Sequence, residues 1–552
     1  MRLFAWLTLL TSIAWAAPRF EITFSASARS TPVDGRLILV VSKNPSSEPR
    51  FQIGMSPDTQ QIFGIDVDGW KPGTPATIDA SAIGHPLRSL RELAPGAYRV
   101  QAVLNVYETF HRADGHTVKM PMDDGEGQHW NRSPGNLISA PKEIQVAADG
   151  VISIALDQVI PPIPAPADTK YVRHVRIQSD LLTKFWGRPM HIGAIVVVPE
   201  GFDENPRQRY PIAFNQGHFP ADFFGFRETP PTPEMKGVER DRAQAGHRFY
   251  QDWTSGRLPK MLIVLTQHAT PFYDDSYGVN TANMGPYGDA LTKELYPHIE
   301  KQFRAIGEPW ARVLYGGSTG GWMTLAQQIF YPEYFGGAWG FCPDPVDFHV
   351  FQLIDVYNDK NAHFDLGSFT RIPRPLGRTR DDHTIITIGE ASQQELVLGT
   401  KSRSGGQMDA FHATFGPVGP DGYPAKLWDP VTGDVDPKVA KYWRDHYDLT
   451  AYLSRDWERL GPKLVGKIHI TMGTKDTYYL DAATVRMEKF LESTKLPRQG
   501  PYYGGSVQYG NNEPHCYTGV PAGQRTETYY LPIFADHMRK MAPKDADTTS
   551  WR

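Results

Sequence analysis

The segment from residue 312 to residue 322 constrains the fold of this chain more than any other. Residues 312–315 (RVLY) have the character of a buried strand, residues 316–321 read GGSTGG, and a helical pattern opens at Trp322. A chain that passes from strand to helix this abruptly needs small residues beside the apex of the turn, which Gly316 and Gly320 supply. The pattern predicts a sheet of strands that alternate with helices, with the Ser318 hydroxyl projecting from the sheet edge.

Apolar strands and helical segments alternate through the second two thirds of the chain. Candidate strands lie at 191–199, 210–215, 261–266, 312–315, 337–341 and 467–472. Several are apolar throughout, as expected of strands covered on both faces. Between two of them, Leu291, Leu295, Ile299 and Phe303 recur at helical spacing. This alternation predicts an α/β fold with helices on both faces of the sheet, spanning residues 170–552.

Residues 17–160 follow a different pattern, in which short strands succeed one another without a helix. Alternating apolar residues from Tyr98 to Val106 are typical, and the segments 144–146 and 151–156 around Asp149-Gly150 predict a closing hairpin. We expect an immunoglobulin-like β-sandwich here. Four prolines between 161 and 166 predict an extended linker over 161–169.

Residues 343–460 interrupt the alternation of strands and helices. The stretch is rich in Pro, Gly and Asp, with a short strand at 385–388 and a helix from Val439 onward. It reads as an insertion between two sheet strands. Its pattern is compatible with a cap over the sheet edge and with a surface excursion.

A serine hydroxyl of ordinary acidity needs a base to attack a carbonyl carbon, and the base needs an acid to orient it. On a sheet of this kind the acid precedes the base in the chain. Asp476 follows the strand 467–472, at the end where an acid is needed. Asp481 is the second candidate, although its place before a helical stretch suits a helix cap better.

The candidate base is His515, which follows the predicted strand 506–509 on a loop. The competing His537 falls within an apparent terminal helix. The sequence therefore predicts a catalytic set of Ser318, Asp476 and His515.

Two hydrogen-bond donors are needed to hold the negative oxygen that forms when a carbonyl is attacked. The backbone N–H of Thr319, at the start of the helix, supplies one. The other should come from the loop after the strand 210–215, where Gly217 precedes His218. We predict the N–H of His218 as the second donor, with Phe219 as the alternative.

The chain has two cysteines, Cys342 and Cys516. Cys342 ends the strand after the Ser318 helix, and Cys516 directly follows His515. Since the loops at the ends of parallel strands lie at one edge of a sheet, the two thiols could meet beside the predicted site. A disulfide and a pair of unpaired buried cysteines are both compatible with this placement.

The net charge and the absence of certain motifs argue against several other classes of protein. The net charge of −4 gives no basic surface for nucleic acid, and the chain contains neither a phosphate-binding loop nor a dinucleotide fingerprint. Asp344, Asp347 and His349 match no known metal-ligand spacing. We therefore predict no cofactor and no metal.

The first 16 residues have the pattern of a signal peptide. Arg2 precedes an apolar run from Leu3 to Trp15, and Ala14-Trp15-Ala16 matches a cleavage site. The run is too short to cross a bilayer, and nothing later in the chain resembles a membrane span. We expect a periplasmic or secreted protein.

From about Tyr171 to its end, the sequence resembles the putative esterase family, which includes esterase D and the enterochelin esterases. The resemblance rests on Gly285-Pro286-Tyr287-Gly288-Asp289, on the Ser318 turn, and on the segment 331–336 (YPEYFG). It implies an α/β-hydrolase fold, ester hydrolysis or acyl transfer, and a triad at Ser318, Asp476 and His515. An upstream β-sandwich also resembles the arrangement in enterochelin esterases. The family's usual His-Gly pair is Gln216-Gly217 here, and the insertion is absent from compact members.

Two other functions remain open at this point. A serine peptidase of the prolyl-oligopeptidase type would also suit the segment 317–321 (GSTGG), although the N-terminal region lacks the repeats of a propeller. A non-catalytic glycan- or ligand-binding protein on a hydrolase scaffold is the other alternative. For an esterase, the sequence indicates a small-molecule or glycan-linked ester as substrate and gives no indication of oligomeric state.

Overall fold

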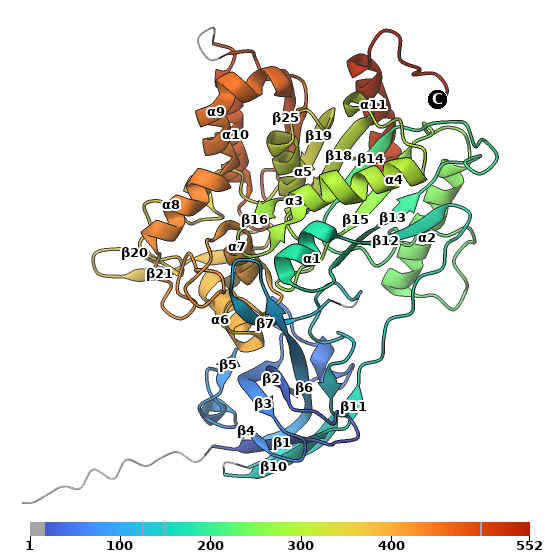
Figure 1. The fold of residues 1–552 in the computed structure, drawn as a ribbon. Coiled ribbons are helices and arrows are strands. Elements are labelled where there is room, and N and C mark those ends of the chain that lie inside the picture. Colours follow the sequence, from blue (N-terminus) through green and yellow to red (C-terminus); the bar gives the residue numbers. More distant parts are fainter. Residues whose placement is uncertain (1–16, 124, 148, 497–499, 552) are drawn as a thin grey trace, which may run out of the picture.

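The computed structural model describes residues 17–123, 125–147, 149–496 and 500–551. An N-terminal β domain lies below a larger α/β domain in Figure 1. Residues 161–169, between the two domains, are exposed and have no regular secondary structure. The predicted signal peptide, residues 1–16, lies outside the described residues.

The N-terminal domain consists of two sheets that face each other. One has the strand order β10-β1-β4, and the other has the order β11-β8-β6-β2-β3-β5, with β7 and β9 also paired to β6. Phe20 of β1, Leu39 of β2 and Leu156 of β10 share one hydrophobic cluster between the sheets. The strand bounds are β1 (Arg19–Phe24), β2 (Val33–Ser42), β3 (Gln61–Trp70), β4 (Ala76–Ile78), β5 (Ile83–His85), β6 (Gly96–His111), β7 (Thr117–Pro121), β8 (Leu137–Ile138), β9 (Lys142–Val146), β10 (Val151–Leu156) and β11 (Gln158–Val159).

The predicted hairpin between residues 144–146 and 151–156 is wrong. Strand β9 pairs with β6 in one sheet, whereas β10 pairs in parallel with β1 in the other. Ile154 and Leu156 of β10 complete the inner face of the smaller sheet, where they are buried. The short segment between the two strands therefore crosses from sheet to sheet, which local turn signals do not reveal.

The α/β domain is organised by a sheet of eight strands in the order β12-β13-β15-β14-β18-β19-β24-β25. The six strands from β15 to β25 in this order are parallel, and β12 and β13 run antiparallel to their neighbours. This arrangement and the helices around it confirm the predicted α/β-hydrolase fold class. The strand bounds are β12 (Val172–Gln178), β13 (His191–Val197), β14 (Ile212–Gln216), β15 (Leu262–Gln267), β18 (Arg312–Gly317), β19 (Gly337–Phe341), β24 (Ile468–Gly473) and β25 (Ser506–Gly510).

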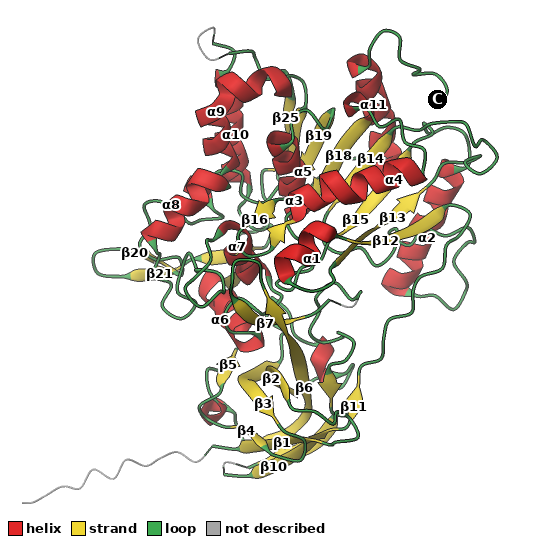
Figure 2. Ribbon diagram, viewed as in Figure 1, coloured by secondary structure: helices red, strands yellow, loops and turns green. Residues whose placement is uncertain are grey.

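Helices cover both faces of this sheet, as Figure 2 shows. Successive residues of β13 point to opposite sides, so that Val196 joins one apolar cluster and Ile195 joins the other. The first cluster includes side chains of α1, α3, α4, α5, α9 and α10, and the second includes those of α2 and α11. The helix bounds are α1 (Asp180–Trp186), α2 (Gly237–Trp253), α3 (Tyr287–Ala290), α4 (Tyr296–Gln302), α5 (Thr319–Phe330), α9 (Leu449–Leu464), α10 (Asp481–Ser493) and α11 (Thr526–Met541), with a π-helical turn, Leu291–Leu295, between α3 and α4.

A long excursion separates β19 from β24, as the sequence predicts. Its helix α6 packs against β2, β3 and β5 of the N-terminal domain. There the buried Arg36 donates to the carbonyl oxygens of Val397 (2.8 Å) and Leu396 (3.0 Å). The excursion thus binds the two domains together. Its elements are β20 (Phe364–Leu366), β21 (Arg371–Pro373), β22 (Pro375–Arg378), β23 (Thr384–Thr387), α6 (Ile388–Leu398), α7 (Gln407–Phe415) and α8 (Pro437–His446); β16 (Asn280–Thr281) and β17 (Gly285–Pro286) pair outside it.

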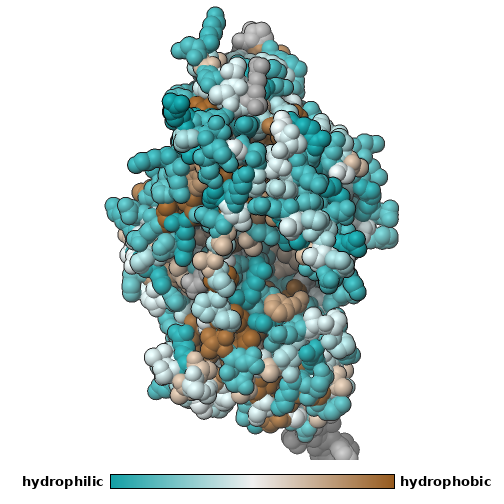
Figure 3. Space-filling model, turned by 90° about the vertical axis from the view of Figure 1, so that its right-hand side faces the viewer, coloured by the Kyte–Doolittle hydropathy of each residue, from teal (hydrophilic) through white to brown (hydrophobic). Residues whose placement is uncertain are grey.

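The outer surface is mainly hydrophilic on the face drawn in Figure 3, and the largest brown area there lies in the lower half. Among the described residues, no helix combines the length and the apolar character that a membrane crossing requires.

Candidate active site

Ser318 occupies the sharp turn between β18 and α5. Its backbone has φ 60° and ψ −126°, a left-handed conformation that side chains rarely adopt. Glycines make the turn sterically feasible: a Cβ on Gly320 would lie 2.1 Å from the Gln216 carbonyl oxygen, and one on Gly316 would lie 2.4 Å from the same atom. The predicted strand, turn and helix are therefore all present, and the strand β14 with its following loop lies directly against them.

A chain of hydrogen bonds joins the three residues that the sequence predicts for catalysis. His515 Nε2 lies 2.8 Å from Ser318 Oγ, and His515 Nδ1 lies 2.7 Å from Asp476 Oδ2. Asp476 follows β24, and His515 follows β25, so both reach the site from the carboxyl ends of adjacent parallel strands. The arrangement allows His515 to take the Ser318 proton while Asp476 holds the imidazole in place.

Backbone and ring contacts fix this chain of hydrogen bonds. The Asp476 side chain is fully buried, and its Oδ1 accepts hydrogen bonds from the backbone N–H of Tyr478 (2.8 Å) and Leu480 (3.3 Å). The Tyr478 ring packs edge-on against His515, with ring centroids 4.9 Å apart. Arg378 of β22 donates to the Asp476 carbonyl oxygen at 3.0 Å. Strand β22 of the insertion therefore supports the loop that carries Asp476. That the insertion caps the site stays a prediction.

The competing candidates have other partners. Asp481 begins α10 and lies 3.4 Å from Arg378. His537 lies in α11, and its Nε2 is 2.8 Å from the Gly336 carbonyl oxygen. Glu513, near the base loop, pairs with Arg380 at 3.1 Å.

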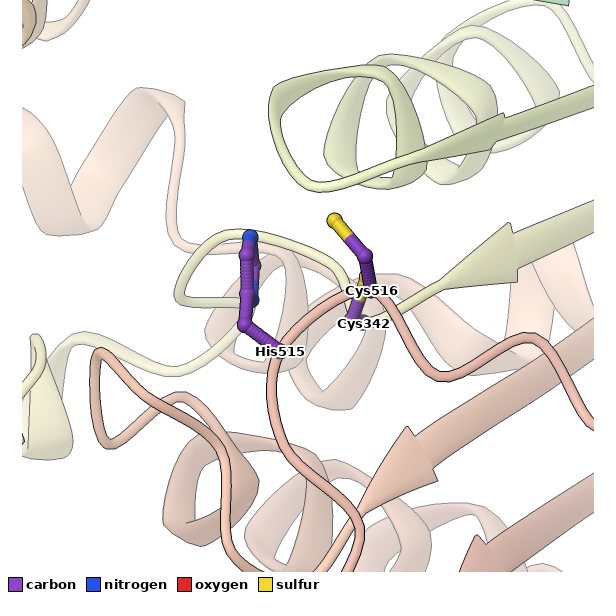
Figure 4. Close-up of side chains that lie close together, drawn as sticks. All are labelled: Cys342, His515 and Cys516. Carbon is purple, nitrogen blue, oxygen red and sulfur yellow. The ribbon is translucent and has the colours of Figure 1, made fainter. Parts of the chain in front are cut away.

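The surroundings of His515 favour its protonated form. Burial lowers the pKa of the imidazole, but the hydrogen bond to Asp476 and the neighbouring Cys516 outweigh burial and raise the pKa to about 10. Cys342, His515 and Cys516 lie side by side where the loops after β19 and β25 meet (Figure 4). Both cysteines are free; Cys342 is buried and Cys516 is exposed.

The predicted oxyanion donors lie on adjacent segments. Thr319 is the first residue of α5, so its N–H has no partner within the helix. The Thr319 hydroxyl donates to Asp344 Oδ2 (3.1 Å), which also accepts from the Tyr277 hydroxyl (2.8 Å). The Asp344 N–H in turn donates to the Ser318 carbonyl oxygen at 3.2 Å. Asp344 and Tyr277 thereby brace the turn, a role that their spacing in the sequence does not indicate.

The loop 216–219 passes close to the start of α5. A Cβ on Gly320 would meet the Gly217 Cα at 2.9 Å, so residue 218 follows immediately beside the turn. Gln216 takes the place of the family's histidine, and its buried side chain bonds to the Tyr296 hydroxyl at 2.9 Å and the Thr266 hydroxyl at 3.0 Å. The alternative donor residue, Phe219, packs against Gly127 of the N-terminal domain.

The His218 side chain belongs to a second histidine–aspartate group. Its Nδ1 lies 3.0 Å from Asp274 Oδ1 and 3.5 Å from the buried Asp275 Oδ2. Burial lowers the pKa of His218, but the two carboxylates outweigh burial and raise the pKa well above its ordinary value. Neither aspartate is predicted from the sequence, because both reach His218 from a different loop, after β15. The Asp-Asp pair itself is the signal that could have indicated them.

Three groups of side chains among the described residues have metal-type ligand atoms within 4.8 Å of one another. They are Cys342, His515 and Cys516; His218, Asp274 and Asp275; and Asp347, His349 and Asp448. In each group, ion pairs or hydrogen bonds to neighbouring side chains account for the histidine and the acids: Asp347, for example, pairs with His349 (2.9 Å) and Arg486 (3.0 Å).

Comparison with protein families identifies the chain. A family model described as Putative esterase matches residues 240–539, which is more than half of the sequence. The chain belongs to the putative esterase family. The matched region contains the Ser318 turn and the two residues hydrogen-bonded in sequence from it, His515 and Asp476. The esterase is thus a serine hydrolase that acts on carboxylic esters.

Several solved structures are similar to this esterase. A ferulic acid esterase has 12% identity and a TM-score of 0.37, with 66% of this chain and 98% of that chain covered. An S-formylglutathione hydrolase from Agrobacterium tumefaciens has 12% identity and a TM-score of 0.33, with 68% and 98% covered. The serine hydrolase FphF from Staphylococcus aureus has 11% identity and a TM-score of 0.33, with 66% and 98% covered. Among curated proteins, no relative matches the chain.

Proposed function

We propose that this protein is an exported esterase that hydrolyses its ester through an acyl-enzyme formed on Ser318. The observation that carries the proposal is the hydrogen-bonded series from Ser318 Oγ through His515 to Asp476, with contacts of 2.8 and 2.7 Å. The serine hydroxyl faces Nε2, the nitrogen that must take its proton, and the carboxylate faces Nδ1, the nitrogen that it must orient.

The reaction proceeds in two displacements. His515 Nε2 takes the Ser318 proton as Oγ attacks the ester carbonyl carbon, and the N–H groups of Thr319 and His218 bind the oxygen that becomes negative. His515 then gives the proton to the departing alcohol, which leaves an acyl group on Ser318. In the second half, His515 activates a water molecule that releases the acid and restores the serine hydroxyl.

Asp476 orients the imidazole and stabilises the imidazolium that forms twice per turnover. Its two backbone donors and its complete burial hold it in one orientation. The proposed substrate is a small-molecule or glycan-linked ester. Export rests on the signal-peptide pattern of residues 1–16, and it predicts a mature protein that begins at Ala17.

Replacement of the nucleophile tests this proposal. Ser318→Ala should lower kcat for p-nitrophenyl esters by a factor on the order of 10⁶, because the acyl-enzyme can no longer form. Ser550→Ala, at an exposed serine near the chain end, serves as the matched control and should keep full activity. Labelling by a fluorophosphonate should occur in the control and be absent in Ser318→Ala.

Two outcomes would contradict the proposal. Equal labelling of both variants would remove Ser318 as the nucleophile. Hydrolysis of peptide amides at rates that match or exceed those of the esters would indicate a peptidase instead. Mass spectrometry of the protein from a periplasmic fraction tests export separately, through the predicted N-terminus at Ala17.

A further inference from the structure

The two cysteines of the chain are far apart in sequence but lie together beside the proposed base. Their sulfur atoms and a ring nitrogen of His515 all lie within 4.8 Å of one another. Figure 4 shows the three side chains on the two loops that meet there. A disulfide bond has a length of about 2.05 Å, and a change of one χ1 between staggered positions moves a sulfur atom by roughly 3 Å. Side-chain rotation can therefore close most or all of the gap.

The two cysteines differ in how firmly they are held and how accessible they are. Cys342 is buried, and its N–H donates to the Thr471 carbonyl oxygen at 2.7 Å. The preceding residue, Phe341, accepts a hydrogen bond from the Ser318 N–H at 3.0 Å. Cys516 is exposed and lies on the loop that carries His515. A bond between them would connect the loop that carries His515 to the strand end that is hydrogen-bonded to Ser318.

Both cysteines also have an unusual backbone conformation. Cys342 has φ 37° and Cys516 has φ 63°, in the left-handed region that non-glycine residues seldom occupy. Strained backbone of this kind persists where the surrounding structure holds it. Here it brings the two thiols to the same point.

We propose that Cys342 and Cys516 form a disulfide in an oxidising compartment, and that this bond positions the His515 loop for catalysis. The proposal rests on the proposed function only for its catalytic consequence, because formation of the bond can be measured without a substrate. Export would deliver the chain to a compartment where such bonds persist.

The chemistry requires an external disulfide, for which oxidised glutathione serves as the reagent. The Cys516 thiolate attacks one sulfur of oxidised glutathione, and a mixed disulfide forms as one glutathione thiolate leaves. The Cys342 thiolate then attacks the Cys516 sulfur and displaces the second glutathione. The two cysteines lose two electrons and two protons, and the glutathione disulfide becomes two thiols.

Bond formation also changes the electrostatic surroundings of His515. Charged or titratable groups face this imidazole from several elements: Asp476 and Tyr478 after β24, Asp344 after β19, and Cys516 beside it. Hydrogen bonding to Cys342 and the nearby imidazole lower the pKa of Cys516, and the resulting thiolate stabilises the His515 imidazolium. A disulfide has no thiolate. Oxidation should therefore make the neutral imidazole, the form that accepts a proton, available at a lower pH.

Purification of the full chain from an oxidising compartment tests the bond itself. The denatured protein should show no reactive thiols, and its intact mass should be lower by two hydrogen atoms than that of the reduced protein. Two free thiols after prolonged incubation with oxidised glutathione would overturn the proposal. This measurement is independent of esterase activity, so an inactive but disulfide-bonded protein would count against the proposed function alone.

The pH dependence of kcat/KM tests the effect on His515. Reduction of the purified protein should move the acidic limb of the profile to higher pH by at least half a unit and lower the melting temperature by a few degrees. Cys516→Ser, which has neither the bond nor the thiolate, should keep the acidic limb of the oxidised protein but have the lower melting temperature. Identical profiles for oxidised and reduced protein would overturn the positioning role.

Discussion

Two histidine–aspartate groups lie near the Ser318 turn, and they differ in the features that the proposed role of His515 as a base requires. His515 and His218 both direct Nδ1 at a carboxylate, at 2.7 Å and 3.0 Å. His515 has a single aspartate partner, a side chain that is 12% exposed, and an Nε2 that faces Ser318 Oγ. His218 has two aspartates within 3.5 Å and a side chain that is 48% exposed.

The comparison teaches that pairing with an aspartate does not by itself create a general base. The opposite ring nitrogen must also face the proton that is to be moved, as His515 Nε2 faces Ser318 Oγ at 2.8 Å. The pKa is raised at both histidines, so the position of the second ring nitrogen distinguishes them rather than charge. The ion pairs of His218 are instead suited to hold the loop that carries its own N–H, which is the proposed second oxyanion donor.

The largest difference between the two groups should appear when each loses its aspartate. Asp476→Asn should lower kcat by a factor on the order of 10⁴, because the amide stabilises the wrong tautomer of His515. Asp274→Asn, the matched change at the second group, should lower kcat by less than about tenfold, because Asp275 remains. Steady-state kinetics with one p-nitrophenyl ester measures both. Equal losses would show that His218 takes part directly in proton transfer.

An intermediate effect is expected when the His218 side chain is removed. His218→Ala keeps the backbone N–H but frees the loop from Asp274 and Asp275, so kcat should fall by about tenfold with little change in KM. Restoration of kcat by His218→Lys, which returns the positive charge, would support an electrostatic anchoring role. A change confined to KM would instead place His218 in substrate binding.

The smallest effect concerns stability as a function of pH. The pKa of His218 is raised in the folded protein, so its ion pairs contribute most below the unfolded value of about 6.5 and lose their contribution as pH rises through the folded value. Because the side chain is half exposed, we expect a contribution of at most about 1 kcal/mol. The melting temperatures of wild type and His218→Ala should differ at pH 6 and converge at high pH. A difference that grows with pH would contradict this ion-pair account.

The sequence allowed the His515 group to be predicted because each of its members follows a recognisable strand. Ser318 and Asp476 lie just beyond apolar runs, His515 follows the predicted strand 506–509, and parallel strands bring such positions to one edge. The partners of His218 had no such signal, because Asp274 and Asp275 meet it only when the loops after β14 and β15 are folded against each other. The spacing of Asp344 gives no sign of its bond to Thr319, which depends on the same kind of loop contact.

Local sequence patterns predicted the positions of individual strands better than they predicted which strands pair with each other. The strands of the parallel sheet were predicted to within a few residues, whereas β12, which has three basic residues among seven (VRHVRIQ), was not predicted. The hairpin was wrong because strand β10 belongs to a different sheet from β9. Pairing depends on which surface buries the apolar side chains, and that information is spread over the whole chain.

The packing of α6 against the N-terminal sheet has a practical consequence for expression of the two domains as separate fragments. Val397 and Leu398 share a buried apolar cluster with Ile38, Val40 and Ile62, and Arg36 is bonded to the end of the helix. Expression of the α/β domain alone, after a cut in the proline-rich linker, would expose the apolar side chains of α6 to water. It would also remove the Arg36 donor from two backbone carbonyl groups at the end of α6. The enzyme should therefore be produced whole, because separation of the two domains would expose this apolar cluster to water.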